Sequence, residues 1–213
     1  EEDTMILAIY GDSISTEGYR EHGYAHLLQD ALGLEKVYNH SIVATTLAAA
    51  VADSGIEIIQ KEENWHPDAD VVILWYGTND WYFGNLPGEE DSRDINTFNG
   101  ALNESVRILR EVNPEVKIIL PTPNLRFQAP DGGEKDGDAR VTPNKAGLTQ
   151  GVYTQAVVNA GERLGCTVIN MQKATGFTFE EMEKYFPDGV HPSKDGYEII
   201  SRIFADTITE IMK

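Results

Sequence analysis

Short, wholly apolar runs alternate with longer segments of helical spacing along most of this chain. In the clearest run, residues 71–76, apolar side chains stand at consecutive positions, so both faces of the strand that it predicts are covered. Such alternation predicts a parallel sheet whose strands are joined by right-handed helical crossovers. Further strands are expected at residues 5–10, 37–40, 116–120 and 167–170, and helices at residues 24–32, 47–61, 98–112, 148–164 and 195–212.

Five strands of this kind fit an α/β fold, a three-layer α/β/α sandwich with the flavodoxin-like strand order 2-1-3-4-5. The length of 213 residues suits one domain, so residues 1–213 are expected to share a single core. Residues 81–94 and 122–147 interrupt the alternation as long loops. The second has an acidic, glycine-rich centre without the residue order of an EF-hand, and we expect it to be solvated and mobile.

The charge balance excludes several classes of partner. The net charge is −18, from 17 Lys+Arg against 35 Asp+Glu, so the surface repels nucleic acid and anionic lipid.

No apolar run reaches the roughly 18 to 20 residues that a membrane span needs, and no membrane insertion is expected. No signal peptide is visible, but the chain begins at Glu1 rather than Met, so a removed leader and an excised domain both stay open. The localisation is therefore left open, and the expectation is a soluble protein, either cytoplasmic or secreted with its leader removed. Cys166 is the sole cysteine, which excludes an intrachain disulfide.

Polar motifs stand at three points where the predicted fold has loops. They follow the first strand, follow the third strand and precede the last helix, as Gly11-Asp12-Ser13, Gly77-Thr78-Asn79-Asp80 and Asp188-Gly189-Val190-His191. With strand order 2-1-3, the order reverses between strands 1 and 3, and ligands bind beyond the carboxyl ends of the strands at that point. The three motifs are therefore expected to meet there.

Together these residue types are the parts of a serine esterase. Ser13 would attack an acyl carbonyl, and His191 would take its proton and return it to the leaving alcohol. Asp188 would orient the imidazole, provided that a turn at Gly189 folds the carboxylate back toward the ring. Asn79 would donate its amide to the oxyanion. Structural roles compete with these: Ser13 could cap the following turn, and Asn79 could stabilise its own turn.

In these three motifs the chain resembles the SGNH, or GDSL-type, hydrolases over nearly its whole length. The resemblance implies a carboxylic ester hydrolase that works through an acyl-enzyme, without metal or cofactor. Its partner would be a small-molecule ester with a small acyl group, such as an acetylated carbohydrate. Lipase or lysophospholipase, thioesterase and acyltransferase activities also occur in the family and stay open as alternatives.

One position departs from the family pattern. A glycine usually follows strand 2, and its N–H completes the oxyanion hole together with the Ser13 N–H and Asn79. Ala44 stands at that position here. Alanine keeps the N–H but disfavours a positive φ. Supporting roles around the site are expected for Asp12, Gly77 and Asp80.

Substrate contacts are predicted from residues near the motifs. Trp81, Tyr82 and Phe83 directly follow the asparagine motif, and they would line an acyl pocket or stack on a sugar ring, or else pin the loop to the core. Arg20 and Arg126 are expected on loops at the same edge, where they would bind polar groups of the substrate.

Two other classes of function compete with the esterase interpretation. In a metallophosphoesterase, Asp12, Asp80, Asp188 and His191 would converge on a metal, but the chain has no His-x-His or Asp-x-His pair. A binding module would use the crevice without turnover, and the presence of all three triad residue types argues against it.

Overall fold

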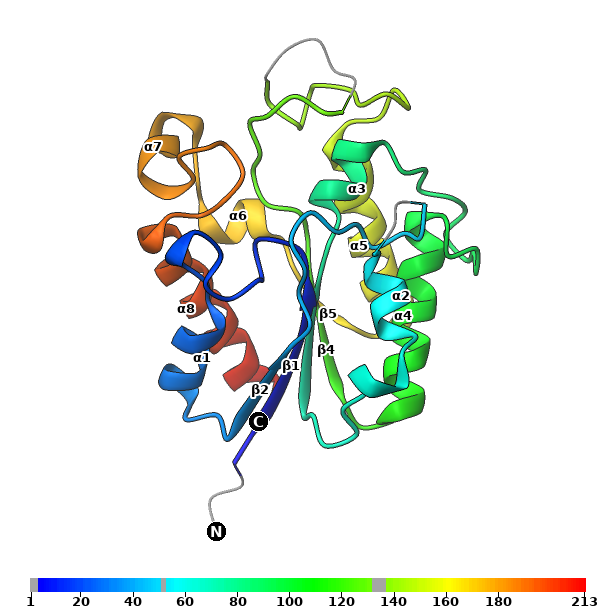
Figure 1. The fold of residues 1–213 in the computed structure, drawn as a ribbon, viewed down its shortest axis with the longest axis vertical. Helices are drawn as coiled ribbons and strands as arrows, with labels where there is room; N and C mark the ends of the chain where they lie inside the picture. The colour runs from blue at the N-terminus through cyan, green and yellow to red at the C-terminus, as the bar shows by residue number, and fades with distance from the viewer. Residues whose placement is uncertain (1–3, 51–52, 132–136) are drawn as a thin grey trace.

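Residues 4–50, 53–131 and 137–213 are described by the computed structural model. Their centre is a five-stranded sheet in the order β2-β1-β3-β4-β5, in which every neighbouring pair is parallel (Figure 1). The predicted α/β class and strand order are thereby confirmed. The strands are β1 (Ile6–Gly11), β2 (Lys36–Asn39), β3 (Val71–Trp75), β4 (Lys117–Pro121) and β5 (Thr167–Ile169).

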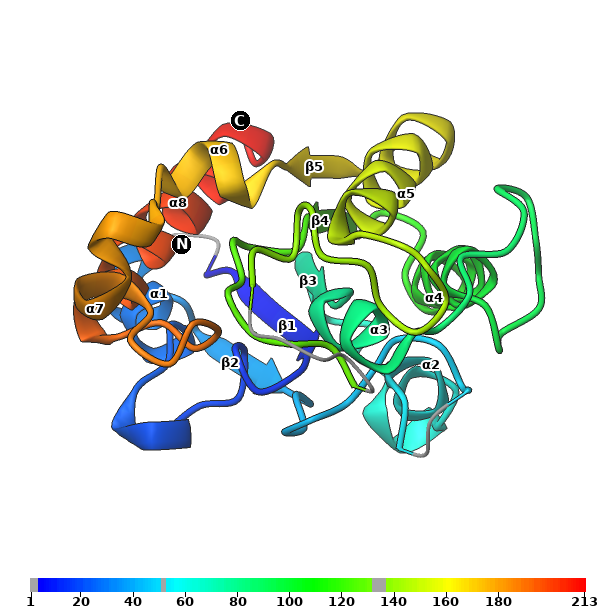
Figure 2. The same cartoon turned by 90° about the horizontal axis from the view of Figure 1, so that it is seen from above.

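Helices cover both faces of the sheet. On one face lie α1 (Ala25–Leu32) and α8 (Lys194–Ile211), and on the other lie α2 (Gly55–Ile59), α4 (Phe98–Val112) and α5 (Gln150–Leu164) (Figure 2). All five residues of β3 are buried. Val72 and Leu74 pack into the core beneath α4 and α5, whereas Ile73 and Trp75 pack into the core beneath α1 and α8. This two-sided burial explains why the strand has no polar alternation.

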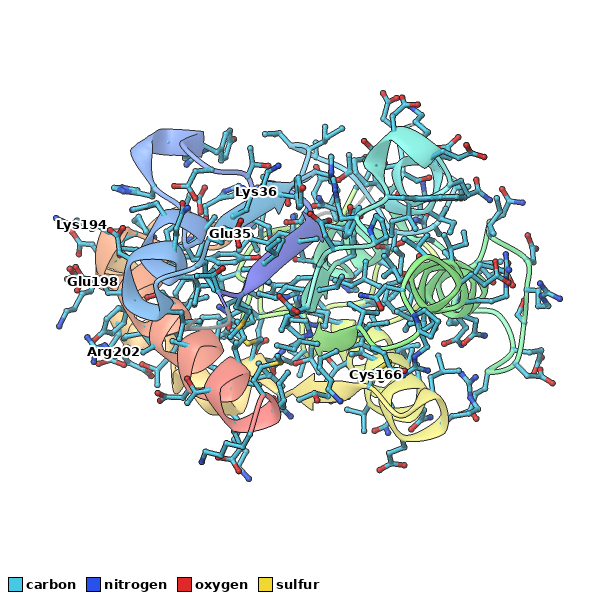
Figure 3. The ribbon with its side chains drawn as sticks, turned by 90° about the horizontal axis from the view of Figure 1, so that it is seen from below. Glu35, Lys36, Cys166, Lys194, Glu198 and Arg202 are labelled. Atoms are coloured by element: carbon cyan, nitrogen blue, oxygen red, sulfur yellow. The ribbon has the colours of Figure 1, made fainter. Side chains whose placement is uncertain are left out.

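The last helix is amphipathic and has a side-chain cap at its start. Ser193 accepts a hydrogen bond from the Gly196 N–H, and Asp195 lies in the first turn, where a negative charge is favourable. The helix buries Tyr197, Ile200, Phe204 and Ile208 against the sheet. Its charged side chains Lys194, Glu198 and Arg202 project outward (Figure 3).

Several short elements were not expected from the sequence. They include α3 (Thr78–Phe83), α6 (Met171–Thr175) and α7 (Met182–Tyr185), with 3₁₀ turns η1 (Tyr19–Glu21), η2 (Glu62–Asn64) and η3 (Phe179–Glu181). Helices of four to six residues are too short to show a helical period, so an apolar pattern cannot reveal them. The predicted loop over residues 81–94 therefore begins inside α3.

The helix predicted over residues 47–61 is wrong in extent, because α2 has only five residues. Asp53 has φ 59°, which no helix accommodates. Ser54 then begins α2 with a capping box, in which it accepts from the Glu57 N–H while the Glu57 side chain accepts from the Ser54 N–H. Leu47 and Ala48 are buried but lie in an irregular segment rather than in a helix. Residues 51–52 lie outside the described residues.

The long loop over residues 122–147 is anchored in the part that the structure describes. Asn144 Nδ2 donates to the carbonyl of Trp81 at 3.0 Å, Ala139 is fully buried, and Phe127 forms an antiparallel bridge with Asp138. The expectation of a solvated loop is therefore wrong for these flanks, whereas the acidic centre at residues 132–136 lies outside the described residues. None of the helices in the described ranges has the length and apolarity needed to cross a bilayer.

Candidate active site

The three polar motifs meet at the carboxyl ends of β1 and β3. The segment after β1, helix α3 and the segment before α8 all lie at this end of the sheet, which faces the viewer in Figure 2. Ser13 stands two residues after β1, and Asn79 is the second residue of α3. His191 stands three residues before α8. The motifs are far apart in sequence but meet here, because the carboxyl ends of parallel strands lie at one edge of the sheet.

A continuous hydrogen-bonded chain joins the serine, the histidine and the aspartate. Ser13 Oγ lies 2.8 Å from His191 Nε2, and His191 Nδ1 lies 2.6 Å from Asp188 Oδ2. With Nδ1–H donating to the carboxylate, Nε2 is left as the acceptor for the serine hydroxyl. Ser13 is buried, and the His191 side chain is 18% exposed, which leaves the histidine accessible from one side.

A tight turn folds Asp188 back onto the histidine. Its Oδ1 accepts hydrogen bonds from the backbone N–H groups of Val190, at 2.9 Å, and of His191, at 2.7 Å. Gly189 has φ 82°, and a Cβ there would lie 2.1 Å from the carbonyl oxygen of Phe127. Partial burial alone would raise the pKa of Asp188, but the hydrogen bonds from His191 and Val190 hold that pKa well below its ordinary value.

A second segment contacts the histidine and aspartate from the solvent side. Arg20 Nη1 donates to Asp188 Oδ2 at 2.7 Å, the same oxygen that accepts from His191. The Tyr19 ring lies 5.2 Å from the His191 ring, and the Arg20 guanidinium lies 5.6 Å from the Tyr19 ring. Arg20 itself has φ 53°. Arg20 was expected to bind substrate, yet it contacts the aspartate, and nothing in the sequence pattern pointed to Tyr19.

Candidate oxyanion donors flank the serine. Ala44 is exposed and has φ 64°, so the chain adopts at this alanine the left-handed conformation that glycine favours. Within the described residues, neither the Ser13 N–H nor the Ala44 N–H donates to any protein group. Asn79 Nδ2 donates one hydrogen to the carbonyl of Thr45 at 2.9 Å, which aims the amide at this loop and leaves its second hydrogen for a ligand.

Asp80 ties α3 to the loop that carries Ala44. It is fully buried, and its carboxylate accepts from the N–H of Leu47 at 2.9 Å, the N–H of Ala48 at 3.1 Å and the amide of Asn85 at 3.0 Å. Burial raises the pKa of Asp80, and these hydrogen bonds oppose that rise. These bonds hold α3, and with it Asn79, against the segment that follows Ala44.

Asp12 lies buried directly before Ser13. Its Oδ1 accepts from the Ile14 N–H at 2.9 Å, which fixes the turn that carries the serine. Burial raises the pKa of Asp12 to about 6, and the hydrogen bond from the Ile14 N–H is the largest effect that opposes that rise. The supporting roles predicted for Asp12 and Asp80 fit these contacts, and so does Gly77, whose φ is 121° and where a Cβ would lie 2.8 Å from Pro123.

Two of the predicted substrate contacts do not reach the surface. Trp81 is fully buried and packs in the core, and the Arg126 side chain is also buried. Both were predicted from their place after a strand, which does not reveal the direction of a side chain. Tyr82 and Phe83 are partly exposed, with ring centroids 4.9 Å apart.

The acidic residues near the serine do not form a metal site. In the described ranges, no three His, Cys, Asp or Glu side chains gather closely enough to hold a metal ion. The Asp80 carboxylate is already occupied by N–H donors, and Asp188 is bonded to His191 and Arg20. The convergence of four groups that the metallophosphoesterase alternative needs is not seen in this structure.

Comparisons with known proteins agree with this geometry. Residues 9–199 match the model of the GDSL-like Lipase/Acylhydrolase family. A GDSL esterase/lipase of Arabidopsis thaliana is 23% identical over 94% of this chain and 85% of its own length. A Lactobacillus plantarum protein is similar in structure, with a TM-score of 0.82, 22% identity and 99% of each chain covered. The lipase/acylhydrolase of Enterococcus faecalis has a TM-score of 0.65 and 21% identity, with 96% of this chain and 95% of that chain covered. The chain therefore belongs to the GDSL-like lipase/acylhydrolase family, whose members are hydrolases of the esterase type.

Proposed function

We propose that this hydrolase cleaves carboxylic esters with small acyl groups, and that acetyl esters of carbohydrates are its natural class of substrate. The observation that carries the proposal is the hydrogen-bonded chain from Ser13 Oγ through His191 to Asp188, in a member of an esterase family. This arrangement makes a hydroxyl nucleophilic at neutral pH, because the imidazole accepts the proton as the oxygen attacks.

In the acylation step, Ser13 Oγ forms a bond to the carbonyl carbon while its proton passes to His191 Nε2. The carbonyl π electrons move to the oxygen, and this oxyanion accepts hydrogen bonds from the backbone N–H groups of Ser13 and Ala44 and from the Asn79 amide. When the tetrahedral intermediate collapses, the bond to the alcohol oxygen breaks and His191 returns its proton to that oxygen.

The deacylation step repeats this chemistry with water. His191 takes a proton from a water molecule, whose oxygen attacks the acyl carbon, and the proton then passes to Ser13 Oγ as the acid leaves. Asp188 stays ionised throughout, because its hydrogen bonds hold its pKa low, and its charge stabilises the transient imidazolium. The ester and water are the only reactants that this cycle consumes.

The choice of substrate class is supported by the surroundings of Asn79. The partly exposed rings of Tyr82 and Phe83 stand three and four residues after it, and aromatic rings of this kind stack on the apolar faces of sugars. The excess of acidic residues, 35 against 17 basic ones, favours a neutral substrate over an anionic one.

Hydrolysis of p-nitrophenyl esters of increasing acyl length tests the proposal. We expect turnover of the acetate to exceed that of the octanoate, to survive EDTA, and to fall at least about 10⁴-fold in Ser13→Ala. Ser41→Ala is a matched control, because Ser41 Oγ is buried and has no hydrogen-bond partner among the described residues. Equal rates for wild type and Ser13→Ala would refute the mechanism, and a preference for octanoate would refute the small-acyl assignment. Release of acetate from acetylated xylan then tests the carbohydrate class, and no release alongside rapid hydrolysis of the simple acetate would refute it.

A further inference from the structure

Arg126 carries a buried positive charge that the esterase cycle does not use. The residue is only 3% exposed, and it forms no ion pair within the described part of the chain. Burying a charge without a paired carboxylate is costly, so a guanidinium in such a place needs a physical reason. The reason is to be found in its contacts.

All of these contacts but one are made to helix α3. Arg126 Nη1 donates to the carbonyl oxygen of Thr78 at 3.2 Å and to the Thr78 hydroxyl at 2.9 Å. The guanidinium also lies 4.8 Å from the Tyr82 ring and 5.4 Å from the Trp81 ring, within the range of cation–π attraction. Outside α3, Nη2 donates to the side chain of Gln128.

These contacts hold the first turn of the helix that carries Asn79. Thr78 directly precedes Asn79, and Arg126 donates hydrogen bonds to both the backbone and the side chain of Thr78. Asp80, which directly follows Asn79, accepts hydrogen bonds from the segment after Ala44. The asparagine thus lies between two residues that are both held in place, Thr78 by the buried Arg126 and Asp80 by N–H donors.

The charge of Arg126 also acts on the site. Burial lowers the pKa of Arg126 to about 10, and the negative charges of Asp12 and Asp188 oppose that decrease, so the guanidinium stays charged at neutral pH. Asp12 precedes the serine, and Asp188 is bonded to the histidine. The Arg126 charge is fixed in a buried region and interacts with both carboxylates. Such a charge also stabilises a new negative charge on a nearby oxyanion.

We propose that Arg126 is a positioning residue of the oxyanion site. It fixes the start of α3 so that the Asn79 amide points at the developing oxyanion, and its charge stabilises that oxyanion. The inference rests on the proposed esterase function. It also replaces the prediction that Arg126 binds substrate, since a side chain that is 3% exposed offers no surface for that contact.

The test compares Arg126→Met and Arg126→Lys with a control on the same loop. Methionine keeps the apolar stem but removes the charge and the donors, whereas lysine keeps the charge and one point of donation. The control is Arg140→Met, since Arg140 also lies over a ring, 5.2 Å from Phe179, but is paired with Asp138 and half-exposed. For each variant, kcat and KM on p-nitrophenyl acetate, the inhibition constant of ethylboronic acid and the thermal midpoint are measured.

Ethylboronic acid reports on the oxyanion site without turnover. Ser13 Oγ adds to boron while its proton passes to His191, and the tetrahedral boron acquires a negative charge like that of the oxyanion. In Arg126→Met we expect kcat to fall about 30- to 100-fold with KM changed less than about threefold, and the boronate to bind weaker by a similar factor. Arg126→Lys should recover part of both losses, and Arg140→Met should match the wild type.

A folded Arg126→Met variant with wild-type kcat and boronate affinity would overturn the proposal. Should that variant fail to fold, Arg126→Lys is judged together with Thr78→Val, which keeps the arginine but removes one acceptor for Nη1. We expect each to lower kcat and boronate affinity by about three- to tenfold, and wild-type values in both would likewise overturn the proposal. Failure of the esterase function is a separate result, because it is read from a Ser13→Ala variant that stays active.

Discussion

Gly189 is the residue on which the geometry of the catalytic turn depends most, and replacing it with alanine has a calculable cost. Its φ of 82° costs an L-residue about 1–2 kcal/mol. The added Cβ would lie 2.1 Å from the carbonyl oxygen of Phe127, whose N–H donates back to the Gly189 carbonyl at 2.8 Å. Because backbone must move to relieve this overlap, we add about 1–3 kcal/mol of overpacking. Gly189→Ala is therefore expected to lower the free energy of unfolding by about 2–5 kcal/mol.

Gly176 separates the two parts of this cost. Its φ is 63°, but a Cβ there would have no neighbour within 4 Å. Gly176→Ala is therefore expected to lower the free energy of unfolding only by the cost of the positive φ, about 1–2 kcal/mol. Urea unfolding of the wild type and both variants measures the free energy of unfolding that each substitution removes. Each kcal/mol lost corresponds to a decrease of about 2–4 °C in the thermal midpoint.

The same substitution is expected to reduce turnover. Movement at Gly189 displaces the N–H groups of Val190 and His191, which hold the Asp188 carboxylate against the histidine. A displacement of about 1 Å in such a group costs roughly 10²-fold. Equal stability losses in Gly189→Ala and Gly176→Ala, together with wild-type kcat in the former, would refute both the steric argument and the role assigned to the turn.

Three further predictions follow from strained or buried groups. Ala44→Gly is expected to stabilise the protein by about 0.5–1 kcal/mol in urea unfolding and to keep kcat within about threefold, because glycine removes the strain at φ 64° and keeps the N–H; a loss of stability would contradict this. Asp12 has its pKa raised to about 6, so its contribution to stability is full below pH 3.8 and is lost as the pH rises toward 6. Asp12→Asn should therefore gain up to about 3 kcal/mol over the wild type at pH 7.5 and much less at pH 4.5, whereas an equal gain at both pH values would exclude this origin. His40 Nε2 lies 2.6 Å from His66 Nε2, and burial lowers the pKa of both rings, so stability is full above pH 6.5 and falls as the pH decreases below it. In thermal melts from pH 7 to 5, a His40→Gln/His66→Gln variant should lose less stability than the wild type, and parallel curves would contradict the argument.

Residue patterns alone were enough to predict the architecture and the place of the motifs. Unbroken apolar runs such as residues 71–76 require cover on both faces, and the crossovers between parallel strands then leave few strand orders. Once the order was predicted, Ser13 and Asn79 had to leave neighbouring strands at the same edge. Gly165, which ends α5 at φ 65°, is a local signal of the same kind, because glycine readily adopts the left-handed conformation that closes a helix.

The arrangement of side chains and irregular backbone around that edge depends on contacts between residues far apart in the sequence. The positive φ at Ala44, the bond from Arg20 to Asp188 and the pairing of His40 with His66 join residues that no periodic pattern relates. The prediction of a helix over residues 47–61 was wrong for the same reason. Asp80, far along the chain, accepts hydrogen bonds from the N–H groups of Leu47 and Ala48. Apolar periodicity records which face of an element is buried, whereas a buried polar group takes whatever partner the packed core brings within reach.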